Sequence, residues 1–356
     1  MVSTSKRQIF IILTGVSGNL GDAVIRRRVL EWVRGTGDIH AYVGRTTPGW
    51  NEQLALTADE TSYGASQRRA WLKNLLFGRG KRALVFDPGE VPLGTPHLKS
   101  ELMFLAVAVV LRLRGAKVIR PPRAVGEYSA LVGGIYRLSA LLSQEVLWRN
   151  KASYTLMKTG KLVPDTAYSE PLVAGIARTE RDYVIVSLRG KRPFPSPLWF
   201  ESVRKFAEDN NLRVKVASQV DEDEVRSEEV AAKLGSIADY IPWGTRSDLE
   251  QELMVRDLYT RAAAVISDRL HVLILASLAG AQPIEAVDKP VPKAEEHFAV
   301  IGLTGMSLDT AKATGPAIVE FLTLQLGRED QLNRDLASAA ARLGREVSRI
   351  RLQLTA

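Results

Sequence analysis

The sequence predicts an α/β protein that has parallel sheets with helices on both faces and is divided into two domains. Short apolar segments with strand character alternate with longer helical patterns through both halves, as in repeated βα units. The 356 residues are enough for two domains with separate cores. An apolar fraction of 46% and a charged fraction of 25% are those of a soluble globular protein.

In the first half, four apolar runs read as strands and four longer segments as helices. The expected strands are Ile9–Leu13, Ile39–Val43, Ala83–Asp87 and Lys117–Arg120, and the expected helices are Asp22–Arg34, Ser66–Leu76, Ser100–Arg114 and Ser129–Trp148. Lys6 and Arg7 before the first apolar run resemble the start of a signal peptide. The run is too short for one and leads directly into a glycine-rich turn, so a first β-strand is the better interpretation.

The second half repeats this pattern after a segment without clear periodicity. Its expected strands are Tyr183–Leu188, Arg213–Ser218, Tyr240–Ile241 and Ala263–Ser267, and its expected helices are Leu198–Asn210, Glu222–Leu234, Ser247–Arg261 and His271–Ala279. The aperiodic segment Asp165–Arg181 follows Pro164 and contains Pro171, which favours a hinge. We therefore expect one domain over residues 1–170 and a second over 171–326.

Residues 327–356 form a separate amphipathic helix in this interpretation. Leucine, isoleucine and valine recur at helical spacing with arginine and glutamate between them, at Leu332, Leu336, Leu343, Val347, Ile350 and Leu354. The pattern covers fewer than four clean heptads, so packing onto the protein is favoured over a dimerising coiled coil.

Composition excludes several classes of function. The chain has no cysteine, which removes disulfides, thiolate nucleophiles and Cys-ligated zinc. The formal net charge is +8, which fits anionic substrates or an anionic membrane surface carrying a lipid-linked glycan. Lysine and arginine are dispersed without an aromatic-interleaved basic motif, so no nucleic-acid partner is expected.

No apolar run is long enough for a transmembrane helix, and we expect a cytoplasmic protein, peripheral to the inner face of the membrane.

The most informative segment lies at the end of the last expected strand. Ser267 ends that strand, and Asp268, Arg269 and His271 occupy the first turn of an apolar helix. The start of a helix offers backbone N–H groups and the positive end of its dipole, which favour an anion. We expect a phosphate or carboxylate site here, with His271 as proton donor. Arg269 has a structural alternative, in which it pairs with Asp268 or Asp239 to hold the turn.

A glycine-rich turn follows the first expected strand and raises a second possibility. The segment Thr14–Gly21 matches the GxxGxxG pattern of dinucleotide-binding reductases, and Arg45 lies where a 2′-phosphate could be bound. Tyr154 and Lys158 have the spacing that short-chain reductases use. A one-domain reductase, however, gives no role to the second half with Arg269 and His271, so this is the weaker interpretation.

Four segments together resemble the polysaccharide pyruvyl transferase family and follow its order along the chain. They are Gly18-Asn19-Leu20-Gly21-Asp22; Leu147–Ser153 with Val163–Ala167; Val184–Arg189; and Ser267-Asp268-Arg269-Leu270-His271 with Gly280-Ala281-Gln282-Pro283. The resemblance covers most of the chain. It implies a GT-B-like fold, in which two Rossmann-like domains face each other across a cleft and the first domain forms the acceptor side.

The resemblance implies transfer of pyruvate from phosphoenolpyruvate to two hydroxyls of one sugar, which gives a cyclic ketal and phosphate. The acceptor would be a glycan or glycolipid at the membrane surface, with phosphoenolpyruvate as co-substrate and no cofactor. The sequence shows no cluster of metal ligands, so we expect no structural metal. The residues that the resemblance assigns are His271 and Arg149 for catalysis; Arg269, Arg189, Ser267 and Leu270 for the donor; and Gly18, Asn19, Gly21, Asp22, Asp87 and Glu90 for the acceptor or its loops.

This chain departs from the family pattern in its first half. Asn150 stands where the family usually has aspartate, one residue after Arg149. The turn after the third strand reads Asp87-Pro88-Gly89-Glu90, with one glycine and two carboxylates, and Pro121–Gly126 replaces a Gly-Pro segment. These departures suggest an unusual acceptor, with Asp87 or Glu90 as a base or as a solvated turn residue.

Two other functions remain open from the sequence. A glycosyltransferase that uses a nucleotide sugar would share the two-domain architecture and the same basic helix start, with Glu285 as the one evident carboxylate for ribose hydroxyls. A non-catalytic glycan-binding or assembly protein would account for the departures at Asp87–Glu90. A homo-oligomer is compatible with each of these functions.

Overall fold

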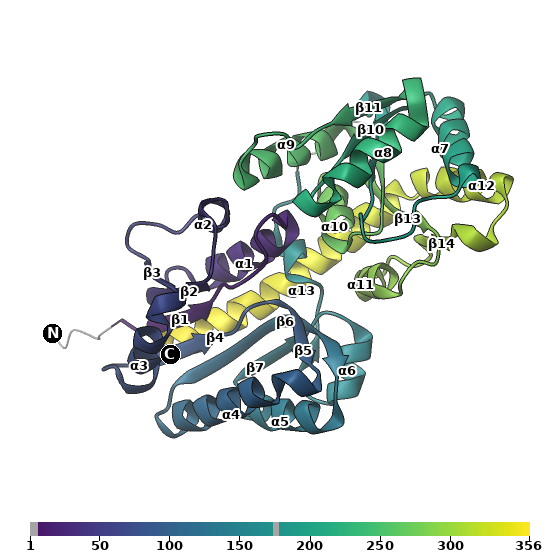
Figure 1. Cartoon of the computed structure of the whole chain (residues 1–356). Coiled ribbons are helices and arrows are strands. Elements are labelled where there is room, and N and C mark those ends of the chain that lie inside the picture. The colour runs from purple at the N-terminus through teal and green to yellow at the C-terminus, as the bar shows by residue number, and fades with distance from the viewer. Residues whose placement is uncertain (1–5, 174–177) are drawn as a thin grey trace. The chain divides into compact units, whose positions relative to one another are not determined.

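The computed structural model describes residues 6–173 and 178–356, which divide into two compact units (Figure 1). Unit 1 comprises the described part of Met1–Ser17 together with Asp22–Ser169 and Ala341–Ala356. Unit 2 comprises Gly18–Gly21 and the described part of Glu170–Ala340. Within the expected hinge Asp165–Arg181, residues 174–177 lie outside the described residues.

Unit 1 is built on a parallel sheet of eight strands. Its strands are β1 (Gln8–Ile12), β2 (Asp38–Gly44), β3 (Thr61–Gly64), β4 (Arg82–Val85), β5 (Gly89–Leu93), β6 (Lys117–Tyr128), β7 (Glu145–Trp148) and β8 (Lys161–Leu162). The order is β3-β2-β1-β4-β6-β7-β8, and β5 pairs with β6. Strands β1 and β4 are almost fully buried because helices cover both faces of the sheet.

The helices of unit 1 follow the expected βα alternation. They are α1 (Leu20–Val33), which begins within the four residues assigned to unit 2, and α2 (Pro48–Leu54), α3 (Arg68–Phe77), α4 (Leu98–Leu113), α5 (Ala130–Leu141) and α6 (Lys151–Met157). Helices α4 and α5 pack side by side on the sheet (Figure 1). The expected helix Ser129–Trp148 was wrong in its second part, because α5 ends at Leu141 and β7 follows. The short apolar run Glu145–Trp148 is fully buried, and periodicity alone cannot distinguish such a run from helix.

Unit 2 contains a six-stranded parallel sheet. Its strands are β9 (Tyr183–Ser187), β10 (Arg213–Ala217), β11 (Ala238–Ile241), β12 (Ala262–Ser267), β13 (Gln282–Val287) and β14 (Ser307–Asp309), in the order β11-β10-β9-β12-β13-β14. This is the strand order of a Rossmann fold, in which the direction of winding reverses between the first and fourth strands. The reversal here lies between β9 and β12.

The helices of unit 2 include all four that were expected. They are α7 (Pro197–Asp209), α8 (Glu224–Leu234), α9 (Asp248–Arg261), α10 (Leu270–Leu278), α11 (Lys293–Ile301) and α12 (Gly315–Leu326). Ser196 caps α7 by accepting a hydrogen bond from the Trp199 N–H, and Ser247 forms a capping box with Glu250 at the start of α9.

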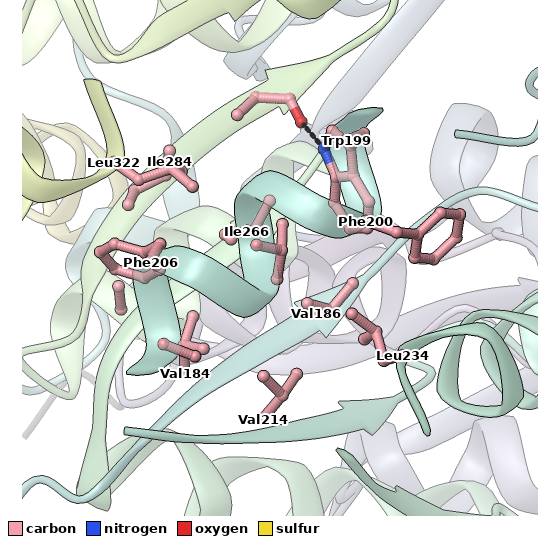
Figure 2. Close-up of a cluster of buried hydrophobic side chains, with 14 of the residues drawn as sticks. Val184, Val186, Trp199, Phe200, Phe206, Val214, Leu234, Ile266, Ile284 and Leu322 are labelled. Carbon is pink, nitrogen blue, oxygen red and sulfur yellow. Dashed lines mark hydrogen bonds between the residues drawn. The ribbon is translucent and has the colours of Figure 1, made fainter. Parts of the chain in front are cut away.

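The core of unit 2 packs α7, α8 and α12 against the sheet. Figure 2 shows Trp199, Phe200 and Phe206 of α7 over Val184, Val186 and Ile266 of the central strands. The indole N–H of Trp199 donates to the Ala286 carbonyl of β13 at 2.7 Å, so the buried polar atom is satisfied (Figure 2).

The C-terminal helix α13 (Glu329–Thr355) packs within its own chain, as expected. Leu332, Leu336, Leu343, Ile350 and Leu354 are buried, while Val347 is half-buried. Its last turns are tied to unit 1, where the Arg351 guanidinium donates to the Trp32 and Arg34 carbonyls at 3.0 and 2.9 Å. The helix therefore completes the fold of a single chain.

Candidate functional site

The central strands of unit 2 bring Ser187 and Ser267 together at their carboxyl ends. The two residues are paired in register, and the Ser267 hydroxyl donates to the Ser187 carbonyl at 2.5 Å. The same hydroxyl accepts from the Arg269 N–H at 3.0 Å. Ser267 therefore fixes the turn from β12 into α10, at the reversal of strand order where open α/β sheets bind ligands.

Helix α10 presents its N-terminus at this position. Arg269 is the N-cap residue in an extended conformation, and no side chain caps the helix. Leu270, expected to contact the donor, has a buried side chain, so only its backbone is suited to ligand contact. The arrangement agrees with the anion site expected from the sequence.

Arg269 is held by two carboxylates of the turn before α8. Its Nε contacts Asp223 and its Nη2 lies 3.2 Å from Glu222 Oε1. The structural alternative considered from the sequence, in which Arg269 pairs with Asp268 or Asp239, named other partners; Asp239 pairs with Arg213, and Asp268 is close enough to affect the pKa of Arg269. The two acidic partners offset the charge of Arg269, which weakens its expected role in donor binding.

His271 packs against the glycine-rich turn. A β-carbon placed on Gly21 would lie 2.5 Å from His271 Cβ and 2.7 Å from His271 Nδ1, so only glycine fits there. Gly18 has a φ of +74°, and a β-carbon on it would come 2.4 Å from Asp221 Oδ2.

Backbone hydrogen bonds hold this turn to unit 2. The Leu20 N–H donates to the Gln219 carbonyl at 3.3 Å, and the Asp221 N–H donates to the Gly18 carbonyl at 3.0 Å. Asn19 forms an antiparallel bridge with Val220. Gly18, Asn19 and Gly21 were expected on the acceptor side in the first domain, whereas their contacts assign them to unit 2 beside His271.

A buried acidic cluster lies next to the start of α10. Asp268 accepts from the Arg189 N–H at 3.0 Å and lies 3.6 Å from the Arg192 Nε. Burial raises the pKa of the Asp268 carboxyl. Burial also raises the pKa of Glu285 to about 7, against the hydrogen bond from Ser307 that favours the charged form. Because Glu285 is fully buried, it does not suit the role of ribose ligand considered from the sequence.

Among the expected donor-binding arginines, Arg189 has one guanidinium nitrogen without a hydrogen-bond partner in the part of the chain that the structure describes. It follows β9, is half-buried, and its Nε is buried without a hydrogen-bond partner among the described residues. It also lies close enough to Asp268 and Glu285 to affect both carboxyls. Arg189 is therefore the best-placed cation for an anionic ligand in unit 2.

Arg149 lies in unit 1 and is committed to an internal ion pair. Its side chain is 3% exposed, and its Nη1 lies 2.6 Å from Asp165 Oδ2. The catalytic role expected of Arg149 has no support in this geometry and stays a prediction. Asn150, the departure from the family pattern, caps α6 by accepting from the Ser153 N–H at 3.2 Å. Asparagine and aspartate serve equally well at an N-cap, so this departure leaves the turn intact.

Unit 1 has a cavity of about 300 Å³ at the carboxyl ends of β1 and β4, where its own strand order reverses. Half of its lining residues come from α3 and α4, and most of these are apolar. Asp87 lines the cavity and pairs with Arg123 at 3.1 Å. The other acceptor candidates of unit 1 lie apart from the cavity lining, with Asp22 paired to Arg26 at 3.5 Å and Glu90 exposed.

Glu101 is a lining residue of this cavity that sequence reasoning missed. It is 5% exposed, and its Oε2 has no hydrogen-bond partner among the described residues. Burial raises its pKa. The one signal in the sequence was an acidic residue in an apolar helix, at a position that the helical period places inside.

The surroundings of the glycine-rich turn Thr14–Gly21 do not favour the weaker interpretation, in which this turn binds a dinucleotide. A β-carbon on Gly15 would lie 2.1 Å from the Trp50 ring, and Gly18 faces Asp221, so protein side chains occupy the space beside both glycines. Tyr154 is exposed on α6, and Lys158 ends that helix with a φ of +50°.

Two further features of the described residues bear on function. Within 6–173 and 178–356, no group of three or more histidine, aspartate or glutamate side chains could hold a metal ion. Over the same ranges, every helix is too short or too polar to cross a bilayer.

Searches with the sequence against protein-family models and curated proteins gave no match. Among solved structures, the chain is similar to UDP-GlcNAc 2-epimerase from Neisseria meningitidis bound to UDP-GlcNAc, with a TM-score of 0.59 and 10% identity over 96% of this chain and 99% of that one. The epimerase from Methanocaldococcus jannaschii gives a TM-score of 0.58 and 12% identity, also over 96% and 99%. HepE from Anabaena in complex with UDP gives 0.54 and 11% over 98% of each chain. This likeness confirms the expected fold class of two parallel-sheet α/β domains, the GT-B fold, with a C-terminal helix.

Proposed function

We propose that this protein is a GT-B transferase that binds the diphosphate of a nucleotide-sugar donor at the start of α10 in unit 2. The observation that carries the proposal is the position of α10. Its N-terminus has no side-chain cap and lies at the reversal of strand order in the sheet, near Arg189, whose Nε has no hydrogen-bond partner among the described residues. Solved structures of the same fold were obtained with UDP or UDP-GlcNAc, which supports this donor class.

In the proposed reaction, an acceptor hydroxyl attacks the anomeric carbon of the donor sugar. The bond from that carbon to the diphosphate oxygen breaks, and the nucleoside diphosphate leaves with the electron pair. The α10 dipole and Arg189 stabilise the negative charge that develops on the leaving group. His271, in the first turn of α10, takes the proton of the acceptor hydroxyl.

Transfer of pyruvate from phosphoenolpyruvate is the second candidate, favoured by the residues Ser267–His271 in their observed turn. In that reaction His271 protonates the methylene carbon of the donor, one acceptor hydroxyl adds to the resulting cation, and phosphate leaves as the second hydroxyl closes the ketal. The donor is small and highly charged, and its binding was expected to rest on Arg149 and Arg269. Both are already paired with carboxylates, so this candidate ranks second.

Titration calorimetry with UDP and with phosphoenolpyruvate, each alone, tests the proposal. We expect UDP to bind the wild type and Arg189→Gln to weaken it by about tenfold or more, since a charge-assisted hydrogen bond to phosphate is lost. Arg213→Gln, at an exposed ion pair in the same unit, is the matched control and should leave UDP affinity unchanged. Binding of phosphoenolpyruvate without UDP would replace the first candidate by the second, and binding of neither would refute both.

His271→Ala tests the assigned proton transfer. Loss of a general acid or base typically lowers the rate by about 10²–10⁴. We expect this loss in donor turnover, with UDP affinity changed less than about threefold because the backbone N–H groups of α10 remain. Near-normal turnover in the variant would remove His271 from the mechanism.

A further inference from the structure

Helices α4 and α5 of unit 1 expose a row of large aliphatic side chains. Leu102, Val109 and Leu113 lie on one face of α4, and Leu131, Leu138 and Leu141 lie on one face of α5. Their exposed fractions range from 41% for Val109 to 82% for Leu113. The two helices pack side by side, so their exposed faces adjoin (Figure 1). Contiguous apolar surface of this kind marks an interaction site.

The same part of the chain carries the protein's positive charge. Residues 65–144 contain thirteen lysines and arginines against four aspartates and glutamates, a net charge of +9, whereas the whole chain has +8. Arg82, Arg120 and Arg123 are buried, so ten cations and three carboxylates of this segment lie outside the core, a net charge of +7. The acidic residue of α4, Glu101, is buried, and the sequence of α5 has none. Lys99, Arg112 and Arg114 are exposed on α4 or directly after it.

Aromatic and basic groups border the aliphatic row at the end of α3. Phe77, the last residue of α3, is exposed, and the Arg114 guanidinium lies over its ring at 5.4 Å from the centroid. Helix α3 packs against α4, so this pair adjoins Leu113. Aliphatic and aromatic groups surrounded by arginine and lysine are the composition of a surface that inserts into the headgroup region of an anionic bilayer.

We propose that the α4–α5 face, with Phe77 and Arg114 at its border, docks the protein on a membrane that contains anionic lipid. Charge decides against a second copy of this chain as the occupant, because a two-fold contact through this face would bring like charges together. Lipid phosphates complement the cations, and the aliphatic side chains enter the acyl boundary without any membrane-spanning helix.

Vesicle co-sedimentation with the full-length protein tests the proposal. The probes are vesicles of phosphatidylcholine alone and of phosphatidylcholine with about one third phosphatidylglycerol, at low and at high salt. We expect binding to the anionic vesicles only, weakened by salt because the attraction of the lysines and arginines is screened. Absence of binding, or equal binding to both vesicles, would overturn the proposal.

Paired variants separate the apolar and charged contributions. Leu113→Ser with Leu138→Ser should lower vesicle affinity by about tenfold or more through lost apolar burial, and Arg112→Gln with Arg114→Gln by about 25-fold through the loss of about fivefold per charge. Leu352→Ser, at a site 70% exposed on α13, and Arg213→Gln with Lys312→Gln are the matched controls and should bind as the wild type.

Light scattering of the same proteins separates the membrane from a protein partner. All these sites are exposed, so each variant should keep the thermal transition of the wild type, and we expect a monomer throughout. Equal losses in the control variants, or a wild-type dimer that Leu113→Ser with Leu138→Ser dissociates, would contradict membrane docking through this face.

Discussion

Gly21 and His271 meet although 250 positions separate them, because the backbone of Gly21 passes where a β-carbon would lie 2.5 Å from His271 Cβ. Gly21 is in the first turn of α1, where alanine would be the better helix former. Glycine at this position therefore serves the contact with the imidazole, which fixes His271 at the start of α10.

Gly21→Ala should destabilise the protein by about 1–3 kcal/mol, because the added methyl forces His271 to move. Donor turnover should fall as well, because His271 is the proposed base. Gly344→Ala is the control, since a β-carbon on Gly344 in α13 meets no atom within 4 Å. That variant should gain about 0.5–1 kcal/mol from reduced chain entropy. If Gly21→Ala were as stable as the wild type, the His271 side chain could move aside without a loss of stability.

Asp165→Ala should cost about 3–5 kcal/mol in the free energy of unfolding, since it leaves the buried Arg149 charge without its partner. Urea denaturation gives the value. Asp239→Ala, at the exposed pair with Arg213, should cost less than about 1 kcal/mol. A stable Asp165→Ala variant that lost only ligand binding would instead place Arg149 in the functional site.

Stability should fall as pH rises from about 4.5 to about 7 through Glu285. Burial raises the pKa of this carboxyl to about 7, so the folded protein keeps a proton that the unfolded chain loses near 4.5. The contribution of protonated Glu285 to the free energy of unfolding is fully present below pH 4.5 and is lost as the pH rises through 7. The loss amounts to roughly 3 kcal/mol in total.

Thermal unfolding of Glu285→Gln across this range checks the effect. The variant should show a flatter dependence than the wild type, although not a level one, because burial also raises the pKa of Asp268 and Glu101. Glu228→Gln, at an exposed site on α8, should follow the wild type. If the stability of Glu285→Gln depended on pH as steeply as that of the wild type, the pH dependence would come from groups other than Glu285.

Glu101→Leu should stabilise the protein at pH 8 by about 1–3 kcal/mol, because it removes a buried carboxyl whose Oε2 has no hydrogen-bond partner in the described part of the chain. The gain should shrink at pH 4, where the raised pKa of Glu101 leaves the wild-type side chain neutral. Chemical denaturation at the two pH values measures both quantities. Loss of stability at pH 8 would show that the carboxyl makes a stabilising contact.

Local patterns were sufficient for most of the βα alternation and for the turn that carries Ser267, Arg269 and His271. A strand followed by a helix is encoded within some twenty neighbouring residues, and the apolar helix α10 begins at such a junction. The buried run Glu145–Trp148 escaped this reasoning because a short, fully buried strand has no alternation to recognise.

The sequence by itself determined two α/β domains, a strand-to-helix turn that carries Arg269 and His271 at the start of α10, and a C-terminal helix that packs on its own chain. Only the tertiary structure decided which charges are free. Arg149 and Arg269 are paired with Asp165, Asp223 and Glu222, whereas the Nε of Arg189 has no hydrogen-bond partner over residues 6–173 and 178–356. Ion pairs and close contacts such as Gly21 with His271 depend on distance in space, and residues far apart along the chain come together only when it folds.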